Sequence, residues 1–303
     1  KQADVVVEDF SPGVMSGIGL GYADLELIKP DLIMTSITYF GQTGPYREFK
    51  GHDMIGLALG GLMYITGLPD REPLKAGGSQ AGLQAGINAA VATLTALYCR
   101  DLTGIGQHVD VSVVECIASI MESATLMYSY NGWTKHRTGA RHSWAYPSTI
   151  LPCKDGYVHV HGSNDWEIIS SFMDEPRLLD PKLREGPARS GDDFDALAMP
   201  WLKQRTKQEI FESAQLWRLP FAMVCAVDEI CDDPQFKARD FFVEVDHPEA
   251  GPLAYPGAPF RMTETPWRCG RAPLLGEHNT EVFGTRLGLT HEDLVRLKEL
   301  GVI

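Results

Sequence analysis

The residues best suited to acid–base or nucleophilic chemistry are one histidine–aspartate pair and two carboxylates further along the chain. His52 and Asp53 are adjacent, and a histidine that titrates near pH ~6.5 suits a general base at neutral pH. Glu115 follows a predicted strand and opens a predicted helix, where the helix dipole favours an anion. Asp110 lies within that strand. Each side chain is a candidate catalytic group, and each also has an ordinary structural use, such as starting a helix.

Two clusters contain residue types that bind metals or anions in other proteins. His159 and His161 alternate on one face of a predicted strand, but no third ligand accompanies them, so an exposed strand face is favoured over a metal site. The residues His136, Arg137, Arg141 and His142 either bind a carboxylate or phosphate or belong to a solvated linker. The six cysteines are widely spaced and form no C-x-x-C motif, which predicts neither zinc nor disulfides.

Strands that alternate with helices must position these side chains. The first part of the chain has predicted strands at 5–7, 31–38 and 107–113 and predicted helices at 22–29, 82–100 and 114–130. This alternation is typical of a parallel sheet with crossover helices. After the basic, aromatic segment 132–145, the sequence predicts strands at 148–152, 157–161 and 258–262 and helices at 164–173 and 207–215. The tail from residue 273, with a helix at 290–300, is predicted to return to the first domain.

Composition predicts a globular protein of the cytoplasm. Of the 303 residues, 44% are hydrophobic and 22% are charged, and the net charge of -13 works against nonspecific binding to nucleic acid or anionic lipid. No signal peptide is recognisable, and the widely spaced cysteines fit a reducing compartment. The segment 76–99 is uncharged, but its glycines and polar residues predict a packed core helix instead of a membrane span.

Short motifs occur in the order and approximate spacing of one known family. In the first domain they are VVVEDFSPGV (5–14), GLGY (19–22), SITYFGQTGPY (36–46), KGHD (50–53), TGLPDREP (66–73) and TGIGQHVDVS (103–112). Further on they are LPCKDGYVHV (151–160), DDPQFKARDFF (232–242) and LLGEHNTEV (274–282). Across essentially its whole length, the chain resembles the family III CoA-transferases, the CaiB/BaiF type.

The resemblance implies that the nucleophile of the family is missing. Family members carry a nucleophilic aspartate four residues before a glycine, at the start of an Ala-rich helix. Here that register reads G-L-Q-A-G, with Gly82 in place of the aspartate and Gly86 matching the glycine. Covalent catalysis requires a side chain at this position, and residues 76–100 contain no carboxylate. The family's leading strand–helix–strand segment would also precede Lys1, so we expect either a fragment or a truncated first domain.

The resemblance also implies binding positions for coenzyme A. Phe10 and Lys50 match positions that contact coenzyme A, and the loop 39–43, with Tyr39 and Gly41, matches one that lines the pantetheine channel. The basic residue that the family has shortly after Phe10 is here Gly17.

The GHD triplet at 51–53 is similar to that of the acyl-CoA racemases of the same family, which makes His52 either an acid–base group or a pocket-lining residue. A racemase would also need a carboxylate at position 82. Glu115 is the alternative nucleophile if the chain is an enzyme on its own.

Together these features predict an α/β fold. It comprises an incomplete doubly wound, Rossmann-like CoA-transferase domain (1–131 and 273–303), a linker (132–145) and a smaller α+β domain (146–272). The resemblance implies a noncatalytic subunit of a CoA-transferase that moves CoA between carboxylic acids, notably dicarboxylic acids. The expected substrates are acyl-CoA and a carboxylic acid, and no metal is expected. The expected partner is a full-length, catalytic homologue in an interlocked heteromer. The alternative is a self-sufficient acyl-CoA transferase or racemase that uses Glu115 or His52.

Overall fold

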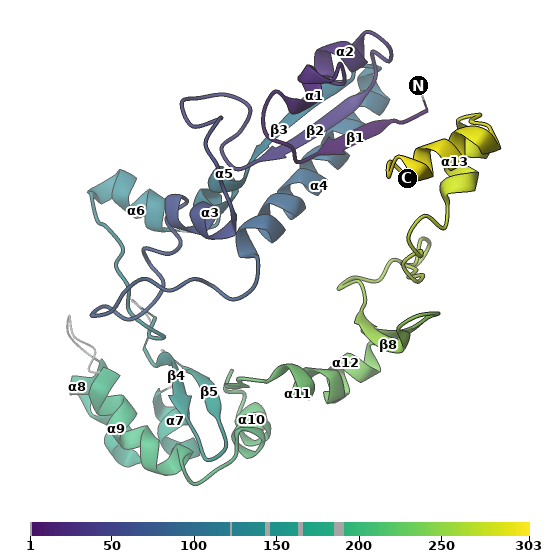
Figure 1. Cartoon of the computed structure of the whole chain (residues 1–303). Coiled ribbons are helices and arrows are strands. Elements are labelled where there is room, and N and C mark those ends of the chain that lie inside the picture. Colours follow the sequence, from purple (N-terminus) through teal and green to yellow (C-terminus); the bar gives the residue numbers. More distant parts are fainter. Residues whose placement is uncertain (1, 122, 143–145, 163–165, 185–190) are drawn as a thin grey trace. The chain divides into compact units, whose positions relative to one another are not determined.

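The computed structural model describes residues 2–121, 123–142, 146–162, 166–184 and 191–303. The chain divides into two compact units, Lys1–Met223 and Val224–Ile303 (Figure 1). The domain boundaries expected from the sequence, with the tail completing the first domain, stay a prediction.

A parallel sheet forms the centre of the first part of the chain. It contains β1 (Val5–Glu8), β2 (Ile33–Thr38) and β3 (Gln107–Ser112) in the order β1-β2-β3. Val6 pairs with Met34 and Ile37 pairs with Val111, so both neighbours run parallel to β2. The central strand is almost entirely buried, although three of its six residues, Thr35, Ser36 and Thr38, carry hydroxyl groups. The mixed α/β fold with a parallel sheet is thereby confirmed.

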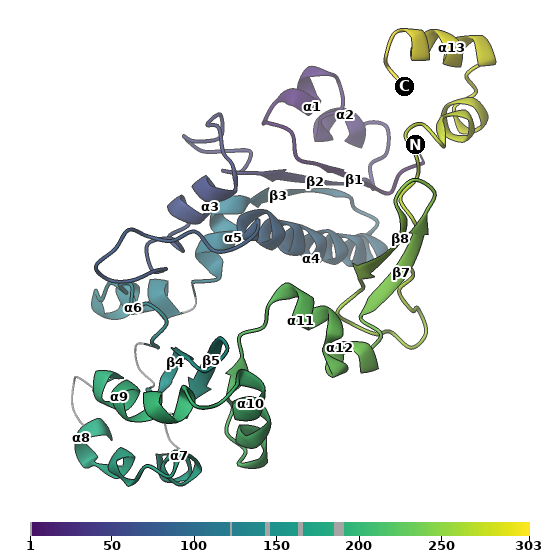
Figure 2. The same cartoon turned by 60° about the horizontal axis from the view of Figure 1, so that its bottom comes forward.

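Helices lie on both faces of this sheet. Figure 2 shows α1 (Val14–Gly17) and α2 (Tyr22–Glu26) on one face and the long α4 (Gln80–Thr103) on the other. The side of α4 that faces inward is made of small residues: Ala81, Ala85, Ala89 and Ala96. Small side chains let the helix approach the strands closely, and the hydroxyls of Thr93 and Thr35 meet at 2.7 Å across that contact.

Two short helices complete the core around the sheet. These are α3 (Asp53–Leu59) and α5 (Val113–Ser119), which bury Leu57 and Ile117 against α4. A Cβ atom at Gly60 would lie 2.5 Å from the Ile117 side chain, so only glycine permits this contact. The predicted helix 114–130 is wrong as a single element, because it is divided into α5 and α6 (Ser123–Asn131). No glycine or proline marks the break, and Ile120 ends α5 outside helical geometry.

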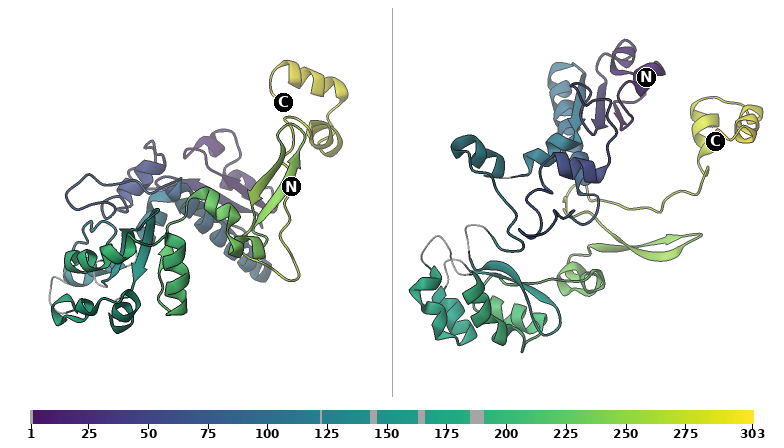
Figure 3. Two further views of the ribbon diagram at one scale, coloured as in Figure 1. Left: turned by 90° about the horizontal axis from the view of Figure 1, so that it is seen from below. Right: turned by 60° about the vertical axis from the view of Figure 1, so that its left-hand side comes forward.

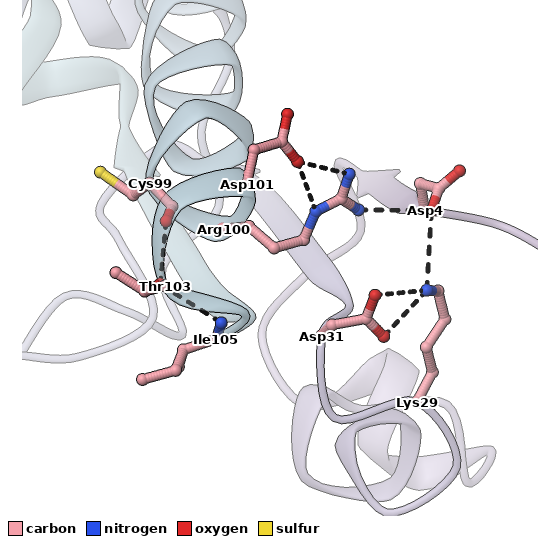
Figure 4. Close-up of polar contacts among 8 residues, drawn as sticks. All are labelled: Asp4, Lys29, Asp31, Cys99, Arg100, Asp101, Thr103 and Ile105. Atoms are coloured by element: carbon pink, nitrogen blue, oxygen red, sulfur yellow. Dashed lines mark hydrogen bonds and ion pairs between the residues drawn. The ribbon is translucent and has the colours of Figure 1, made fainter.

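An ion-pair network fixes the far end of α4 to the edge of the sheet (Figure 4). Arg100 reaches Asp4 at 3.3 Å and Asp101 at 3.3 Å, while Lys29 reaches Asp4 at 3.6 Å and Asp31 at 2.8 Å. Asp4 therefore joins the start of β1 to both α4 and the segment after α2. Hydrogen bonding to Asp31 raises the pKa of Lys29, and the reciprocal bond lowers the pKa of Asp31.

A second core forms between residues 146 and 223. Its antiparallel sheet has the order β4-β5-β6 and contains β4 (Ser148–Pro152), β5 (Tyr157–His161) and β6 (Ala222–Met223). The helices are α7 (Trp166–Met173), a 3-10 turn (Pro176–Leu179), α8 (Pro181–Arg184), α9 (Gly191–Leu202) and α10 (Lys207–Leu216). Fully buried Phe194, Ile169 and Phe221 fill the space between them. The first two strands were predicted with these bounds; residue 164, where helix α7 was expected to begin, lies outside the described residues.

The second unit contains short helices and one β-hairpin. Its elements are α11 (Val227–Asp232), α12 (Pro234–Ala238), β7 (Phe242–His247), β8 (Gly251–Pro256), a π-helical turn (Thr280–Arg286) and α13 (His291–Glu299). Figure 3 shows β7 and β8 as one twisted ribbon. The strand predicted at 258–262 is wrong, because the pairing residues are Phe242–His247 and Gly251–Pro256 instead. Pro256 and Pro259 flank the start of the predicted strand, and proline cannot donate to a ladder.

Within the described residues, no helix is both long enough and apolar enough to cross a bilayer.

Candidate functional site

A cavity of about 350 Å³ opens at the carboxyl ends of β1 and β2. This edge of a parallel sheet is where open α/β folds bind ligands, because the strands end there and loops diverge. The lining residues come from five places: the turn after β1, the end of β2 and its loop, the segment before α3, the start of α4 and the start of α5. They are Asp9, Phe10, Ser11, Pro12, Ile37, Thr38, Tyr39, Phe40, Arg47, Phe49, Lys50, Gly51, Gly82, Ala85, Gly86 and Val113.

The first two turns of α4 present bare backbone to this cavity. Gly82 and Gly86 are four residues apart and therefore lie one above the other on the same face of the helix. A Cβ atom at either position would meet no atom within 4 Å. Neither glycine is therefore required by close packing, and position 82 has room for a side chain that would project from the start of the helix.

Asp53 holds the start of α4 in place. Its Oδ1 accepts hydrogen bonds from the backbone N–H groups of Ala81 at 2.9 Å and Gly82 at 3.2 Å. These N–H groups belong to the first turn of the helix and have no partner within it. The Lys75 ammonium lies 3.8 Å from the buried Oδ2, which has no hydrogen-bond donor among the described residues. The structure therefore uses Asp53 as a cap between α3 and α4.

Replacing this cap should destabilise the fold measurably. We expect Asp53→Ala to lower the free energy of unfolding by about 2 kcal/mol, since it removes an acceptor for two helix N–H groups. Asp53→Asn should recover part of the loss, because an amide oxygen still accepts. Urea denaturation measures both, with the exposed Asp70→Ala as the matched control. Equal stabilities for Asp53→Ala and Asp70→Ala would show that the cap contributes nothing.

Cationic and aromatic residues line the same cavity as the glycines. Lys50 is exposed and makes no ion pair or hydrogen bond with any described residue, whereas Arg47 pairs with Glu48 at 2.9 Å. The rings of Phe10, Tyr39 and Phe49 supply apolar surface. Cations beside aromatic rings suit a ligand that has an anionic group and an apolar body.

Tyr39 is held at the cavity wall by a close contact with Gly51. A Cβ atom at Gly51 would lie 2.2 Å from the Tyr39 ring, so a larger residue would displace it. Partial burial raises the pKa of the Tyr39 hydroxyl, and the negative charges of Asp53 and Asp9 raise it further. Tyr39 therefore stays a neutral hydrogen-bonding group at physiological pH.

The structure brings some predicted site residues together and leaves others outside. Phe10, Tyr39, Lys50 and Gly82 all line the cavity, whereas Gly41 and His52 do not. Gly41 adopts a φ of +82° in the turn after β2, where a larger residue would be strained. The Nδ1 atom of His52 accepts a hydrogen bond from the N–H of Met54 at 3.3 Å and so caps α3.

The two other candidate carboxylates also lie outside the cavity lining. Glu115 is exposed in the first turn of α5, where its N–H donates to the Ser112 hydroxyl at 3.4 Å. Both carboxylate oxygens of Asp110 accept from the N–H of Gln42, at 3.1 and 3.0 Å. These contacts fit helix-starting and turn-stabilising roles.

The predicted histidine pair and basic cluster make contacts within the chain. His159 and His161 stack at 6.0 Å on β5, and Nδ1 of His161 meets the Ser148 hydroxyl at 2.9 Å. Burial, and then the charge of His161, lower the pKa of His159. Among the described residues, no group of three or more His, Cys, Asp or Glu side chains could hold a metal ion.

The two arginines of the basic cluster bind protein groups. Arg137 donates to the carbonyl of Tyr64 at 3.0 Å and of Leu68 at 3.2 Å. Arg141 binds the carboxylates of Asp192 and Asp195, both at 2.6 Å. These contacts fasten the segment around residues 136–142 to the protein, and they occupy the groups that could bind an anion.

Sequence reasoning missed three lining residues whose side chains could contact a ligand. Arg47 and Phe49 stand just before Lys50, so a basic and aromatic run was visible but unused. Asp9 follows β1 beside the predicted Phe10 and is the one carboxylate among the described residues that line the cavity. Only the fold shows that the turn after β1 and the segment 47–51 face the same space.

Comparison with known proteins is consistent with this geometry. The succinyl-CoA–D-citramalate CoA-transferase of Chloroflexus aurantiacus is 35% identical over 310 residues, covering 99% of this chain and 76% of that protein. Subunit BbsE of the succinyl-CoA:(R)-benzylsuccinate CoA-transferase of Thauera aromatica is 30% identical, covering 93% and 72%. A crystal structure of a CaiB/BaiF family protein from Brucella suis matches with a TM-score of 0.81 and 32% identity, covering 94% and 75%.

The family model described as CoA-transferase family III matches residues 1–279, most of the chain. The motifs, the parallel sheet and the cavity at its carboxyl edge agree with that match. The chain therefore belongs to CoA-transferase family III.

Proposed function

We propose that this chain is the noncatalytic subunit of a CoA-transferase that moves CoA between dicarboxylic acids, and that a homologous chain supplies the nucleophile. The observation that carries the proposal is Gly82. It lies in the first turn of α4, lines the cavity and has no side chain. According to the family resemblance, this position carries the nucleophilic aspartate in other members. Both named relatives act on succinyl-CoA and a second dicarboxylic acid, and one is a subunit by name, which supports the proposal.

The chemistry that the family resemblance implies cannot proceed on a glycine. An aspartate oxygen attacks the thioester carbonyl, CoA leaves as the thiolate, and a mixed anhydride forms. The thiolate then attacks the aspartyl carbonyl, which releases the first acid and leaves CoA on the enzyme as a thioester. The acceptor carboxylate repeats these two exchanges in reverse order. Each step forms or breaks a bond to the aspartyl group, and Gly82 has no such group.

The rest of the cavity keeps the features of a binding site. Lys50 provides positive charge for a phosphate or carboxylate, and the nearby rings provide apolar surface for a pantetheine arm. A pocket with binding groups but no nucleophile at position 82 is what we expect of a noncatalytic subunit.

Lys50→Ala should therefore weaken binding of CoA to the assembled complex. An ammonium contact to an anion in an exposed position contributes on the order of 1.5 kcal/mol, or about tenfold in Kd. Isothermal titration with CoA measures the change, and Lys203→Ala, which removes another exposed lysine, should have no effect. If the wild-type chain within its complex contributes no CoA site, Lys50 is a surface lysine and this part of the proposal fails.

The outer face of α4 supports the proposal that another chain binds this one. Six large apolar side chains, spaced three or four residues apart, are 59–70% exposed along it: Leu83, Ile87, Val91, Leu94, Tyr98 and Leu102. The helix has 24 residues and is therefore about 36 Å long. Such a continuous apolar stripe is typical of a surface that another chain covers, and it begins beside the glycines of the cavity.

Co-purification from the native source tests the proposal. We expect a homologous chain with aspartate at the position of Gly82 to accompany this one in a complex of stable stoichiometry. A homodimer of this chain that transfers CoA without any partner would contradict the proposal.

A second candidate function is a self-sufficient CoA-transferase with a relocated nucleophile, and Asp9 is the observation that favours it. This carboxylate lines the cavity and makes no ion pair or hydrogen bond with the described residues. Asp9→Asn separates the two candidates, because it would abolish turnover by the isolated chain in the second case and leave turnover by the complex intact in the first.

A further inference from the structure

A second cavity, of about 330 Å³, lies beyond the other end of α3. Its lining residues come from the turn after α3, from α6 and its preceding residues, and from the segment 134–135. This cavity and the one beside Gly82 have no lining residue in common, so the two are separate. Its surface is almost entirely apolar, and the residues that matter most are Gly61, Tyr64, Met121, Thr125, Tyr128 and Lys135.

The walls are held open by specific contacts. The Tyr64 hydroxyl meets Nδ1 of His136 at 3.1 Å, and the Tyr64 carbonyl accepts from Arg137 at 3.0 Å. The Arg137 guanidinium also lies over the Tyr64 ring, 5.8 Å from its centroid. Gly61 has a φ of +89°, and a Cβ atom there would lie 2.9 Å from the Met121 methyl group. The cavity is therefore a preformed feature of the fold.

One lysine is among the residues that line this apolar space. Lys135 is half-buried and lines the cavity, yet it makes no ion pair or hydrogen bond with any described residue. Its neighbours differ, because His136 and Arg137 both bind protein groups. Because no acidic side chain among the described residues pairs with Lys135, its ammonium group is available to an anionic ligand.

We propose that this cavity binds a small carboxylic acid with an aryl or alkyl body, whose carboxylate pairs with Lys135. Ligand sites are mostly apolar and have a few polar groups that fix the orientation of the ligand, and the tyrosine rings with a single ammonium at the rim match that arrangement. The volume lies at the small end of the range for ligand sites, which suits a free acid and excludes a whole acyl-CoA. The site acts independently of the cavity beside Gly82.

Ligand-observed NMR with 3-phenylpropanoate tests this proposal on the purified chain, or on the complex in which it is isolated. The uncharged 3-phenylpropanamide is the matched ligand. We expect the acid to bind about tenfold more tightly than the amide, as one charge-assisted contact implies. Lys135→Gln should remove this preference and leave the amide binding unchanged. Thr125→Phe, at an exposed position of α6 that lines the cavity, should abolish binding of both ligands.

Two controls make the result specific. Lys203→Gln removes an exposed lysine elsewhere and should leave both affinities unchanged. Lys50→Gln should also leave 3-phenylpropanoate binding unchanged, because Lys50 lines the other cavity. The proposal is overturned by equal affinity for acid and amide, by undetectable binding of the acid at millimolar concentration, or by loss of binding in Lys50→Gln.

Discussion

Gly82→Asp should give this chain the ability to form a covalent adduct with CoA. A Cβ atom at position 82 meets no atom within 4 Å, and the position faces the cavity at the start of α4. An aspartate there gains from the helix dipole and replaces a glycine, which is a poor helix former. We therefore expect the variant to fold at least as well as the wild type and to form an enzyme-bound CoA thioester with acyl-CoA.

Two variants control for charge and position. Gly82→Asn has the same shape but a poor nucleophile, and Gly86→Asp places a carboxylate one turn further along the same face of α4. Intact-protein mass spectrometry should show the CoA mass increment only for Gly82→Asp, and borohydride should reduce that adduct. If Gly82→Asp folds and binds CoA but stays unmodified, position 82 is not the nucleophile position.

The second large effect concerns the outer face of α4. Val91→Glu combined with Leu94→Glu should abolish assembly with the partner chain, since it places two charges in the middle of the exposed apolar stripe. A stable interface buries about 800 Å² on each partner, and an unpaired buried charge costs about 3–5 kcal/mol. We expect the dissociation constant of the complex to rise at least a hundredfold.

Size-exclusion chromatography with light scattering measures this loss, and circular dichroism shows whether the variant chain still folds. Leu216→Glu is the matched control, because Leu216 is also a highly exposed leucine but lies on α10, away from the stripe. Assembly that survives the double substitution would show that the partner binds elsewhere and that α4 is covered in another way.

Local sequence patterns were sufficient to predict the sheet. The apolar run Val5–Val7 lies in β1, and the segment 31–38, which contains the apolar run Leu32–Met34, includes β2. The alternation in Tyr157–His161 likewise became β5, which is half-buried. The hairpin of β7 and β8 was missed, because β8 has five consecutive exposed residues, Pro252–Pro256, in place of an alternating pattern.

The candidate site was only partly predictable, for a physical reason. Phe10, Tyr39 and Lys50 were found through family motifs, and the structure places all three at one cavity. The cap that Asp53 provides to Gly82 joins residues 29 positions apart in the sequence. Such a contact depends on how α3 and α4 pack, which no local spacing records. The same holds for Asp9, which reaches the cavity only because β1 lies beside β2.

The most direct test of the proposed function is mass spectrometry of the native complex after treatment with acyl-CoA. The proposal predicts a CoA thioester on an aspartate of the partner chain and no adduct on this chain, with Glu115→Gln leaving turnover nearly intact. A CoA adduct that maps to Asp9, Glu115 or any other carboxylate of this chain would contradict the proposal and identify the chain as an enzyme with a relocated nucleophile.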